Sequence, residues 1–287
     1  MAWNRIESEV IKVNKEVSDK SYQSFSTFLY KECGIVLGGA KQYLVRSRLL
    51  PLVHEFGFES VDSAIATITA RTNLKLCKAA IEVMTTNETL WFRDKYPYEI
   101  LKNTVLPNFS KLNKRLTVWS AACSTGQEPY SIAMTVLEYQ RQNPSAFSAG
   151  VSIIGTDLSL KVLEQSQSGI YEEIALKRGL PDDMRQRYFH QHENGTYIVN
   201  DQLKRLVSFK QLNLVTQKSS YQKAGIVFCR NVLIYFDNEE KTNILQNISA
   251  CLQKGGTLFL GASESLAGAQ DQFDMIKSSS GLYYSKR

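Results

Sequence analysis

Hydrophobic positions change their spacing part-way along the chain. In residues 1–85 apolar side chains recur every three or four positions, the spacing of one helix face, and β-rich runs bounded by turns are missing. Between residues 115 and 287 short β-branched or apolar runs alternate with longer helical patterns. The short runs are Leu116–Ser120, Val151–Gly155, Val207–Phe209, Ile226–Phe228 and Thr257–Leu260. This alternation predicts an α/β fold with a parallel-rich sheet and helices on both faces.

One stretch of the α/β region departs from regular alternation. Asn194-Gly195 is a strong tight-turn dipeptide, and the β-prone run Thr196–Val199 follows it. We therefore predict a small antiparallel β-subdomain inserted near residues 185–204. The complete division that we expect is a helical N-terminal domain over 1–85, a connector that contributes to the active site over 86–99, and an α/β domain over 100–287.

Composition and charge narrow the class of protein. Hydrophobic residues make up 43% and charged residues 22% of the chain, ordinary values for an ordered globular protein. The N-terminus has no apolar core of signal-peptide length, and no stretch reaches the roughly 18 apolar residues of a membrane span, so we expect a cytoplasmic protein. The net charge of +6 comes without a block of basic residues, so nucleic acid is not signalled and an acidic protein substrate suits equally well.

Cysteines and histidines give no metal signal. The five cysteines are widely spread without a C-x-x-C pair, so we interpret them as reduced thiols. The three histidines lack a helical partner or a nearby cysteine cluster. We expect no catalytic metal.

The first βα unit carries a loop of small residues. The strand beginning at Leu116 leads through Ser120–Gly126 into a helix with Pro129 in its first turn. In open parallel sheets this loop borders the ligand crevice, although a tight turn without a ligand has the same sequence. Gly126 is its only glycine, so the G-x-G-x-x-G fingerprint is absent, and no Gly-Lys-Ser/Thr occurs. S-adenosylmethionine has no pyrophosphate and does not require those glycines, so the loop favours this cofactor.

Asp157 ends the second predicted strand. A carboxylate at that strand end can accept both hydroxyls of a ribose. Because Leu158-Ser159 follow, it could instead cap the next helix.

Four motifs in this order resemble the chemotaxis methyltransferase family, often called CheR, over essentially the whole chain. They are Thr86–Arg93, Ser120–Ser131, Gly155–Asp157 and Phe228–Asp237. The resemblance implies a Rossmann-like class I methyltransferase domain. It also implies cofactor contacts from Asn87, Thr89, Arg93, Glu128, Asp157, Asn213, Leu214, Arg230 and Asn231. Tyr235 is placed beside the transferred methyl, and Arg93 and Tyr235 are the implied catalytic residues.

The implied reaction transfers the methyl group of S-adenosylmethionine to glutamate side chains of bacterial chemoreceptors, which gives methyl esters. A glutamate with a pKa of about 4.3 is ionised at neutral pH, so no general base is required. Positioning and desolvation then supply most of the catalysis. Arg93 suits a carboxylate of the substrate or of the cofactor, and Tyr235 can donate one hydrogen bond.

Other interpretations of these residues remain open. Asn87 and Thr89 could cap a helix, and Arg93 could pair with a surface carboxylate. Further alternatives are a solvated Glu128, a strand end capped by Arg230 and Asn231, and a Tyr235 that only packs. The chain could also bind S-adenosylmethionine as a receptor-docking sensor or methylate another substrate. Methyltransferases that act on nucleobases commonly carry Asp/Asn-Pro-Pro-Tyr/Phe after their fourth strand. The segment 231–235 lacks this proline pair, so methylation of a nucleobase is disfavoured.

A helical segment of the N-terminal domain carries the predicted docking surface. Lys41 and Arg48 flank an apolar edge at helical spacing, and Pro51 should kink this helix or start a new one. A solvated basic face is the alternative. The family's use of this domain against helical receptor bundles favours docking. Some members also hold a receptor tail through a Gly-x-Gly-Pro element in the β-subdomain, which residues 190–200 lack, so we expect no dependence on the tail.

Overall fold

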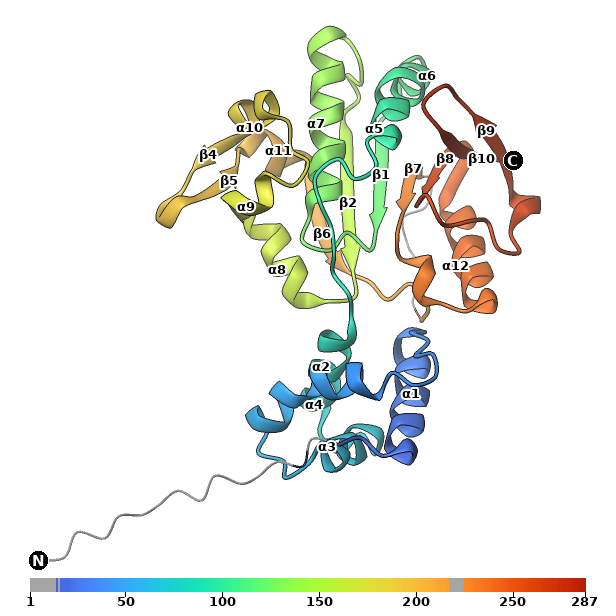
Figure 1. The fold of residues 1–287 in the computed structure, drawn as a ribbon. Helices are drawn as coiled ribbons and strands as arrows, with labels where there is room; N and C mark the ends of the chain where they lie inside the picture. Colours follow the sequence, from blue (N-terminus) through green and yellow to red (C-terminus); the bar gives the residue numbers. More distant parts are fainter. Residues whose placement is uncertain (1–13, 15, 217–223) are drawn as a thin grey trace, which may run out of the picture. The chain divides into compact units, whose positions relative to one another are not determined.

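The computed structural model describes residues 14, 16–216 and 224–287. The chain divides into two compact units, Met1–Thr86 and Asn87–Arg287 (Figure 1). Within the described residues no helix is long and apolar enough to cross a membrane.

Helices form the N-terminal unit. They are α1 (Asp19–Cys33), α2 (Gln42–Glu55), α3 (Val61–Thr69) and α4 (Leu74–Met84). Side chains of Ser18, Ser60 and Asn73 cap the first turns of α1, α3 and α4, as short polar residues do. Each helix buries one apolar face, so the periodicity of the sequence is confirmed here.

Of the two outcomes predicted for Pro51, a kink or the start of a new helix, the structure excludes the second. The helix α2 runs from Gln42 to Glu55 as one helix with Pro51 inside it, so this proline starts no new helix. Leu49 and Val53, on either side of Pro51, are both buried. Packing of this apolar face offsets the hydrogen bond that proline cannot donate.

A seven-stranded sheet is the centre of the second unit. Its strands are β1 (Leu116–Ala121), β2 (Val151–Asp157), β6 (Val207–Gln211), β7 (Ala224–Cys229), β8 (Leu252–Leu260), β9 (Phe273–Lys277) and β10 (Leu282–Lys286). They lie in the order β6-β2-β1-β7-β8-β10-β9, in which β6 to β8 are parallel and β10 is antiparallel to both neighbours. The five predicted strands are confirmed, and the antiparallel pair β9–β10 was not predicted.

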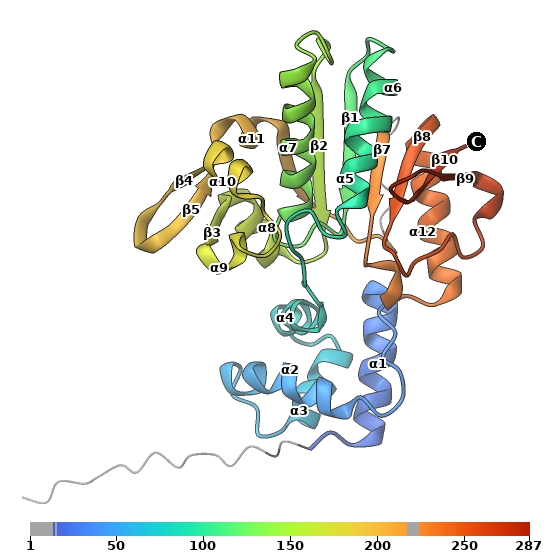
Figure 2. The ribbon, with the colours of Figure 1, turned by 45° about the horizontal axis from the view of Figure 1, so that its top comes forward.

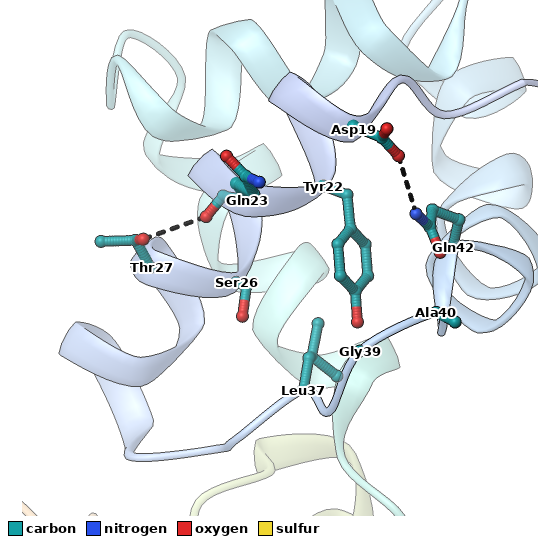
Figure 3. A pocket seen from close by; sticks show the side chains of 9 residues that line it. All are labelled: Asp19, Tyr22, Gln23, Ser26, Thr27, Leu37, Gly39, Ala40 and Gln42. Carbon is teal, nitrogen blue, oxygen red and sulfur yellow. Dashed lines mark hydrogen bonds between the residues drawn. The ribbon is translucent and has the colours of Figure 1, made fainter.

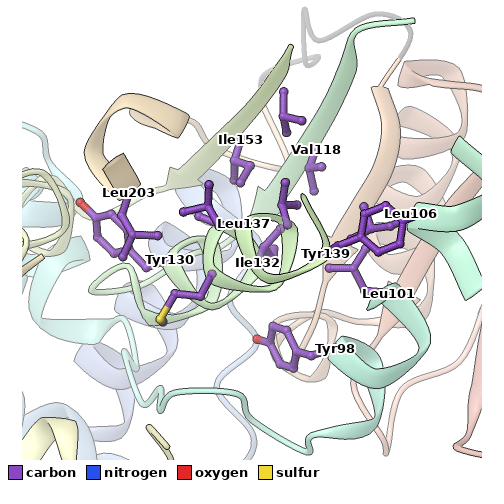
Figure 4. Packing of buried hydrophobic residues seen from close by; sticks show 14 of the residues in the cluster. Tyr98, Leu101, Leu106, Val118, Tyr130, Ile132, Leu137, Tyr139, Ile153 and Leu203 are labelled. Atoms are coloured by element: carbon purple, nitrogen blue, oxygen red, sulfur yellow. The ribbon is translucent and has the colours of Figure 1, made fainter. Parts of the chain in front are cut away.

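Successive strand residues point to opposite faces of this sheet, where helices cover them. The helices that bear on the site are α5 (Tyr96–Ile100), α7 (Gln127–Gln142), α8 (Leu160–Ser168) and α12 (Asn238–Cys251). On one face Val118 and Ile153 pack with Ile132 and Leu137 of α7 (Figure 4). The other face carries a second buried cluster that includes Ile244 of α12. Because helices cover both faces of the sheet, the side chains that alternate along each central strand are buried on both sides.

The antiparallel β-subdomain is also confirmed. It is a three-stranded sheet in the order β3-β5-β4, with β3 (Ile170–Glu172), β4 (Phe189–Gln191) and β5 (Thr196–Val199). Asn194 and Gly195 in the connecting turn have φ values of 54° and 74°. Positive φ at both residues is what an Asn-Gly hairpin turn requires. Figure 2 shows this hairpin beside the short helices α9 (Glu173–Leu176), α10 (Asp182–Tyr188) and α11 (Asp201–Leu206).

The second unit therefore has the predicted fold, a Rossmann-like α/β domain with an inserted antiparallel subdomain. The remaining helical segments of this unit are η1 (Leu101–Val105), α6 (Leu106–Ser110), η2 (Glu193–Gly195), η3 (Leu233–Tyr235) and η4 (Gln270–Gln272).

Candidate active site

The carboxyl ends of five parallel strands meet along one edge of the large sheet. The register pairs Ala121 with Cys229, Asp157 with Gln211, and Cys229 with Leu260. The strand order also reverses at β1, which lies between β2 and β7. Ligands of open α/β sheets bind at such a switch point. The predicted cofactor residues that follow these strand ends are Glu128, Asp157, Asn213, Leu214, Arg230 and Asn231.

The loop between β1 and α7 has an unusual backbone. Ala122, Ser124 and Gly126 have φ values of 61°, 49° and 93°. The Ser166 hydroxyl donates to the Ser124 carbonyl over 2.9 Å, and the Tyr171 hydroxyl donates to the Thr125 carbonyl over 2.7 Å. Non-glycine residues with positive φ persist only where surrounding contacts hold them, and they gather at functional sites.

Asp157 joins this loop to the end of β2. Its Oδ2 accepts from the Ser124 amide over 2.8 Å, and its Oδ1 accepts from the Ser159 amide over 3.1 Å. The N-cap of α8 is Ser159, whose side chain accepts from the Val162 amide. The alternative in which Asp157 is the helix cap is therefore wrong. Its contact with a ribose stays a prediction.

Hydrogen bonds join the connector to the same loop and to α7. The Ser124 hydroxyl donates to the Asn87 carbonyl over 2.8 Å, and the Phe92 amide donates to the Ser131 hydroxyl over 3.1 Å. Thr85 is the C-cap of α4 and Lys95 is the N-cap of α5. Asn87 and Thr89 therefore cap neither helix, and their predicted contacts with the cofactor stay predictions.

Arg93 lies in a strained turn. Its neighbours Phe92, Asp94 and Lys95 have φ values of 47°, 65° and 52°. The Arg93 guanidinium donates to the Glu88 carbonyl over 3.1 Å and, among the described residues, forms no salt bridge. The alternative of a surface ion pair is not seen. Positive φ on both sides of Arg93 marks this turn as a candidate functional feature, and the role of Arg93 stays a prediction.

The buried guanidinium of Arg230, which directly follows β7, bonds both to the connector and to the first turn of α7. Arg230 Nη1 donates to Glu128 over 2.9 Å, and Nη2 donates to Asp94 over 2.7 Å and to the Arg93 carbonyl over 2.9 Å. The other carboxylate oxygen of Glu128 accepts from the Ser120 hydroxyl over 2.8 Å. Only 1% of the Arg230 side chain and 12% of the Glu128 side chain are exposed. Glu128 is thus not the solvated residue of the alternative interpretation.

The charges of this network balance one another. Burial raises the pKa of Glu128, while Arg230 and Ser120 lower it in part. Burial lowers the pKa of Arg230, but the negative charges of Glu128 and Asp94 raise it by more. The net pKa is therefore raised and the guanidinium stays protonated. The positive charge of Arg93 also lowers the pKa of Glu128, so Arg93 acts on the same cluster.

Two predicted residues follow β6. The Asn213 side chain accepts from the Val215 amide over 3.0 Å and so closes a local turn. Leu214 packs at the margin of the cluster that includes Ile244. Both lie at the proposed edge, and their contacts with the cofactor stay predictions.

Two carboxylates at the same edge were missed in the sequence. Asp94 pairs with Arg230, and Glu264 accepts hydrogen bonds from the loop that carries Asn231 and Tyr235. The missed signal for Glu264 is its place four residues after the end of β8, a parallel strand. Asp94 directly follows Arg93 and has no comparable signal.

The predicted docking residues lie in the N-terminal unit, and their environments differ. Lys41 is exposed at the N-cap of α2. Arg48 is half-buried, and its Nη1 donates to the carbonyls of Val83, Met84 and Thr85 at the end of α4 over 3.2, 2.7 and 2.8 Å. Arg48 therefore has a structural role that the sequence does not reveal, namely to satisfy the last carbonyls of a helix.

A polar cavity of about 450 Å³ also lies in this unit, between α1 and the segment before α2 (Figure 3). The Gln42 amide donates to Asp19 over 3.0 Å, and the Tyr22 hydroxyl donates to the Gly38 carbonyl over 2.6 Å. These groups of the lining are bonded within the unit, and none of them is a predicted site residue.

Comparison with known proteins identifies the family. The family model described as "CheR methyltransferase, all-alpha domain" matches residues 20–85. The family model described as "CheR methyltransferase, SAM binding domain" matches residues 87–282. This chain belongs to the CheR methyltransferase family. The resemblance noted in the sequence is confirmed, and so is S-adenosylmethionine as the cofactor.

Curated relatives of this CheR methyltransferase cover nearly all of it. The "Chemotaxis protein methyltransferase" of Vibrio parahaemolyticus is 47% identical over 93% of this chain and 97% of its own length. The "Chemotaxis protein methyltransferase 1" of Pseudomonas aeruginosa is 45% identical over 93% of this chain and 98% of its own. A solved TehB-like methyltransferase from Corynebacterium glutamicum covers 77% of this chain and 99% of its own at 10% identity, and its TM-score of 0.39 is too low to add to the assignment.

Asp157 at the end of β2 and Arg93 in the connector fit this cofactor chemically. A ribose requires hydrogen-bond acceptors, which Asp157 offers, and an amino-acid carboxylate requires a cation, which Arg93 offers. When bound, the cofactor supplies an electrophilic sulfonium methyl group.

We expect Asp157→Ala to weaken the binding of S-adenosylhomocysteine by about 1–3 kcal/mol, because a buried acceptor is lost. The same change frees the Ser124 amide and loosens the loop after β1. Calorimetric titration measures the effect. Asp157→Asn keeps one acceptor oxygen and should give an intermediate affinity. Parental affinity in a folded Asp157→Ala protein would remove Asp157 from the cofactor site.

Proposed function

We propose that this methyltransferase converts glutamate side chains of bacterial chemoreceptors into methyl esters. Its relatives carry the name chemotaxis protein methyltransferase. The observation that carries the proposal is the placement of Arg93, a guanidinium without a carboxylate partner among the described residues, on a strained turn tied to the site. An unpaired planar cation suits an anionic group of the cofactor or of the substrate.

The protein's part in this reaction is to orient a group that is already reactive. A glutamate with a pKa of about 4.3 is ionised at neutral pH, so no side chain has to remove a proton. Arg93 would hold the glutamate or the amino-acid carboxylate of the cofactor. The Tyr235 hydroxyl has no hydrogen-bond partner in the part of the chain that the structure describes, so it is available to donate one. Exclusion of water then strengthens both contacts.

Labelled S-adenosylmethionine and cytoplasmic receptor fragments test this proposal. The protein should transfer label that alkali releases as methanol, because carboxylate methyl esters are labile to base. Receptor fragments whose candidate glutamates are changed to glutamine are the matched control and should remain unlabelled. Cofactor binding without any transfer would instead support the sensor, and base-stable label would support another substrate.

The receptor's helical bundle is the proposed partner of the N-terminal unit. Lys41, at the N-cap of α2, is exposed and can attract an acidic surface. The guanidinium of Arg48, in contrast, already donates hydrogen bonds to the end of α4. Arg46 is exposed on α2 as well, but two residues before Arg48 it lies on a different helix face. Of the two predicted docking residues, Lys41 is therefore the one that can be tested without disturbing the unit.

The proposal includes independence from a receptor tail. β4 is an edge strand of only three residues, and the turn that follows lacks the Gly-x-Gly-Pro element. A strand-adding peptide draws affinity from main-chain hydrogen bonds and specificity from side-chain pockets, and neither is well supplied here.

We therefore expect receptor fragments with and without their tails to be methylated at the same rate. Lys41→Glu should slow both reactions, with a loss that shrinks as salt is added, because surface charges are screened. Arg46→Glu removes the same charge from another face and should have the smaller effect. Micromolar binding of a free tail peptide, or slower methylation of tailless fragments, would contradict this prediction.

A further inference from the structure

The loop after β8 places one carboxylate against the loop after β7. Glu264 Oε2 accepts from the amides of Asn231 and Gly261 over 2.8 and 2.7 Å, and Oε1 accepts from the amide of Leu233 over 2.8 Å. Three amides from two loops thus converge on one side chain. Charge-assisted hydrogen bonds of this type are about twice as strong as neutral ones.

Gly261 makes room for this arrangement. A Cβ at position 261 would lie 2.6 Å from Glu264 Oε2 and 3.0 Å from both the amide nitrogen and Nδ2 of Asn231. Any larger residue would push the carboxylate or the Asn231 loop away. The glycine and the glutamate therefore act as one structural unit at the end of β8.

The amides held by Glu264 belong to the segment that carries two predicted site residues. Asn231 has a φ of 59°, which is costly for a residue other than glycine. Leu233 begins the 3₁₀ turn that ends at Tyr235, and the Phe236 amide closes this turn on the Leu233 carbonyl over 3.1 Å. Glu264 thus accepts from the amide of Asn231 itself and from the amide of the residue that begins the Tyr235 turn.

We propose that Glu264 is a positioning residue for methyl transfer, with a separate task for each oxygen. Oε2 fixes the cofactor side of the loop through Asn231, and Oε1 fixes the turn that presents Tyr235. This inference rests on the proposed function of Tyr235 and Asn231. Both oxygens accept hydrogen bonds from backbone amides, and this positioning role requires no proton transfer by Glu264.

Glu264→Gln separates the two tasks. The amide oxygen of glutamine keeps the Oε2 position, where it can accept from two amides, and its NH₂ group then faces the Leu233 amide as a second donor. We expect the 3₁₀ turn to loosen while Asn231 stays anchored. Affinity for S-adenosylhomocysteine should then remain at the parental value, whereas kcat should fall about 10- to 100-fold, the usual consequence of a reacting group misplaced by about 1 Å.

Amide hydrogen exchange gives a readout that does not depend on the reaction. In Glu264→Gln the Leu233 amide should exchange faster, and the Gly261 amide should exchange at the parental rate. Glu264→Ala should accelerate both amides and weaken cofactor binding as well. A cavity of about 100 Å³ lies beside Glu264 and can admit a water to the truncated site, which helps the alanine variant to fold.

Ser265→Ala is the matched control, since Ser265 lines the same small cavity as Glu264. It should leave kcat, affinity and exchange unchanged. Parental kcat in Glu264→Gln with slow exchange at Leu233 would overturn the inference, and so would equal loss at Leu233 and Gly261. A parent protein that binds cofactor but methylates no receptor would remove the proposed function, while the exchange pattern would still test the two tasks of Glu264.

Discussion

Replacing Arg230 with methionine should lower the free energy of unfolding by about 3–5 kcal/mol, because the change strands buried carboxylate charge. The guanidinium is 1% exposed and pairs with both Glu128 and Asp94. Methionine fills much of the same volume, so the loss reports the charge and the hydrogen bonds more than a cavity. Urea unfolding at neutral pH measures it.

The cost should depend on pH in a defined direction. Burial already raises the pKa of Glu128 above its ordinary value of 4.5, and the loss of Arg230 raises it further. The folded variant then binds a proton that the unfolded chain has released, so its stability falls as the pH rises above about 4.5. The difference from the parent should therefore shrink in acid.

Arg141→Met is the control for the Arg230 variant. Arg141 is 57% exposed and pairs with Glu138 three residues away, so its loss should cost less than about 1 kcal/mol. If Arg230→Met and Arg141→Met unfold at the same urea concentration, the buried network does not hold the connector in place.

The sequence locates the edge of the sheet but not the pairs that form there. Parallel strands and their ends follow from short apolar runs, so Asp157 and Arg230 were placed correctly at strand ends. Arg230 meets Glu128 and Asp94 across 102 and 136 residues of chain. No local pattern contains such a pairing, because it exists only once the connector has folded back over the switch point.

Other features that the sequence does not reveal have a similar cause. Arg48 looks like one more cation on a basic face, yet its partners are carbonyls 35 to 37 residues later in the chain. The strands β9 and β10 were missed because their side chains are largely exposed or half-buried, so no continuous apolar run marks them. In both cases tertiary contacts decide what a weak local signal leaves open.

Arg93→Ala should reduce kcat by about 10²–10³, the effect of removing one well-placed donor from a site of developing or transferred charge. The fold should survive, because within the described part of the chain the side chain makes one hydrogen bond, to the Glu88 carbonyl, and alanine keeps the Arg93 carbonyl that accepts from Arg230. Tyr235→Phe should cost less, since it removes a neutral hydroxyl. Steady-state methylation of receptor fragments at saturating substrate measures both.

Binding data then show which carboxylate Arg93 holds. If the guanidinium holds the cofactor's amino-acid carboxylate, affinity for S-adenosylhomocysteine falls together with the rate; if it holds the substrate glutamate, affinity stays and only transfer falls. Arg178→Ala is the matched control, because Arg178 is an exposed cation that pairs with the Glu88 carboxylate and leaves the strand ends untouched. Parental transfer by Arg93→Ala would mean that the strained turn serves the fold alone. The methyl-accepting carboxylate would then need another cation at the edge, and Arg230, which is buried and already shared by two carboxylates, cannot supply it.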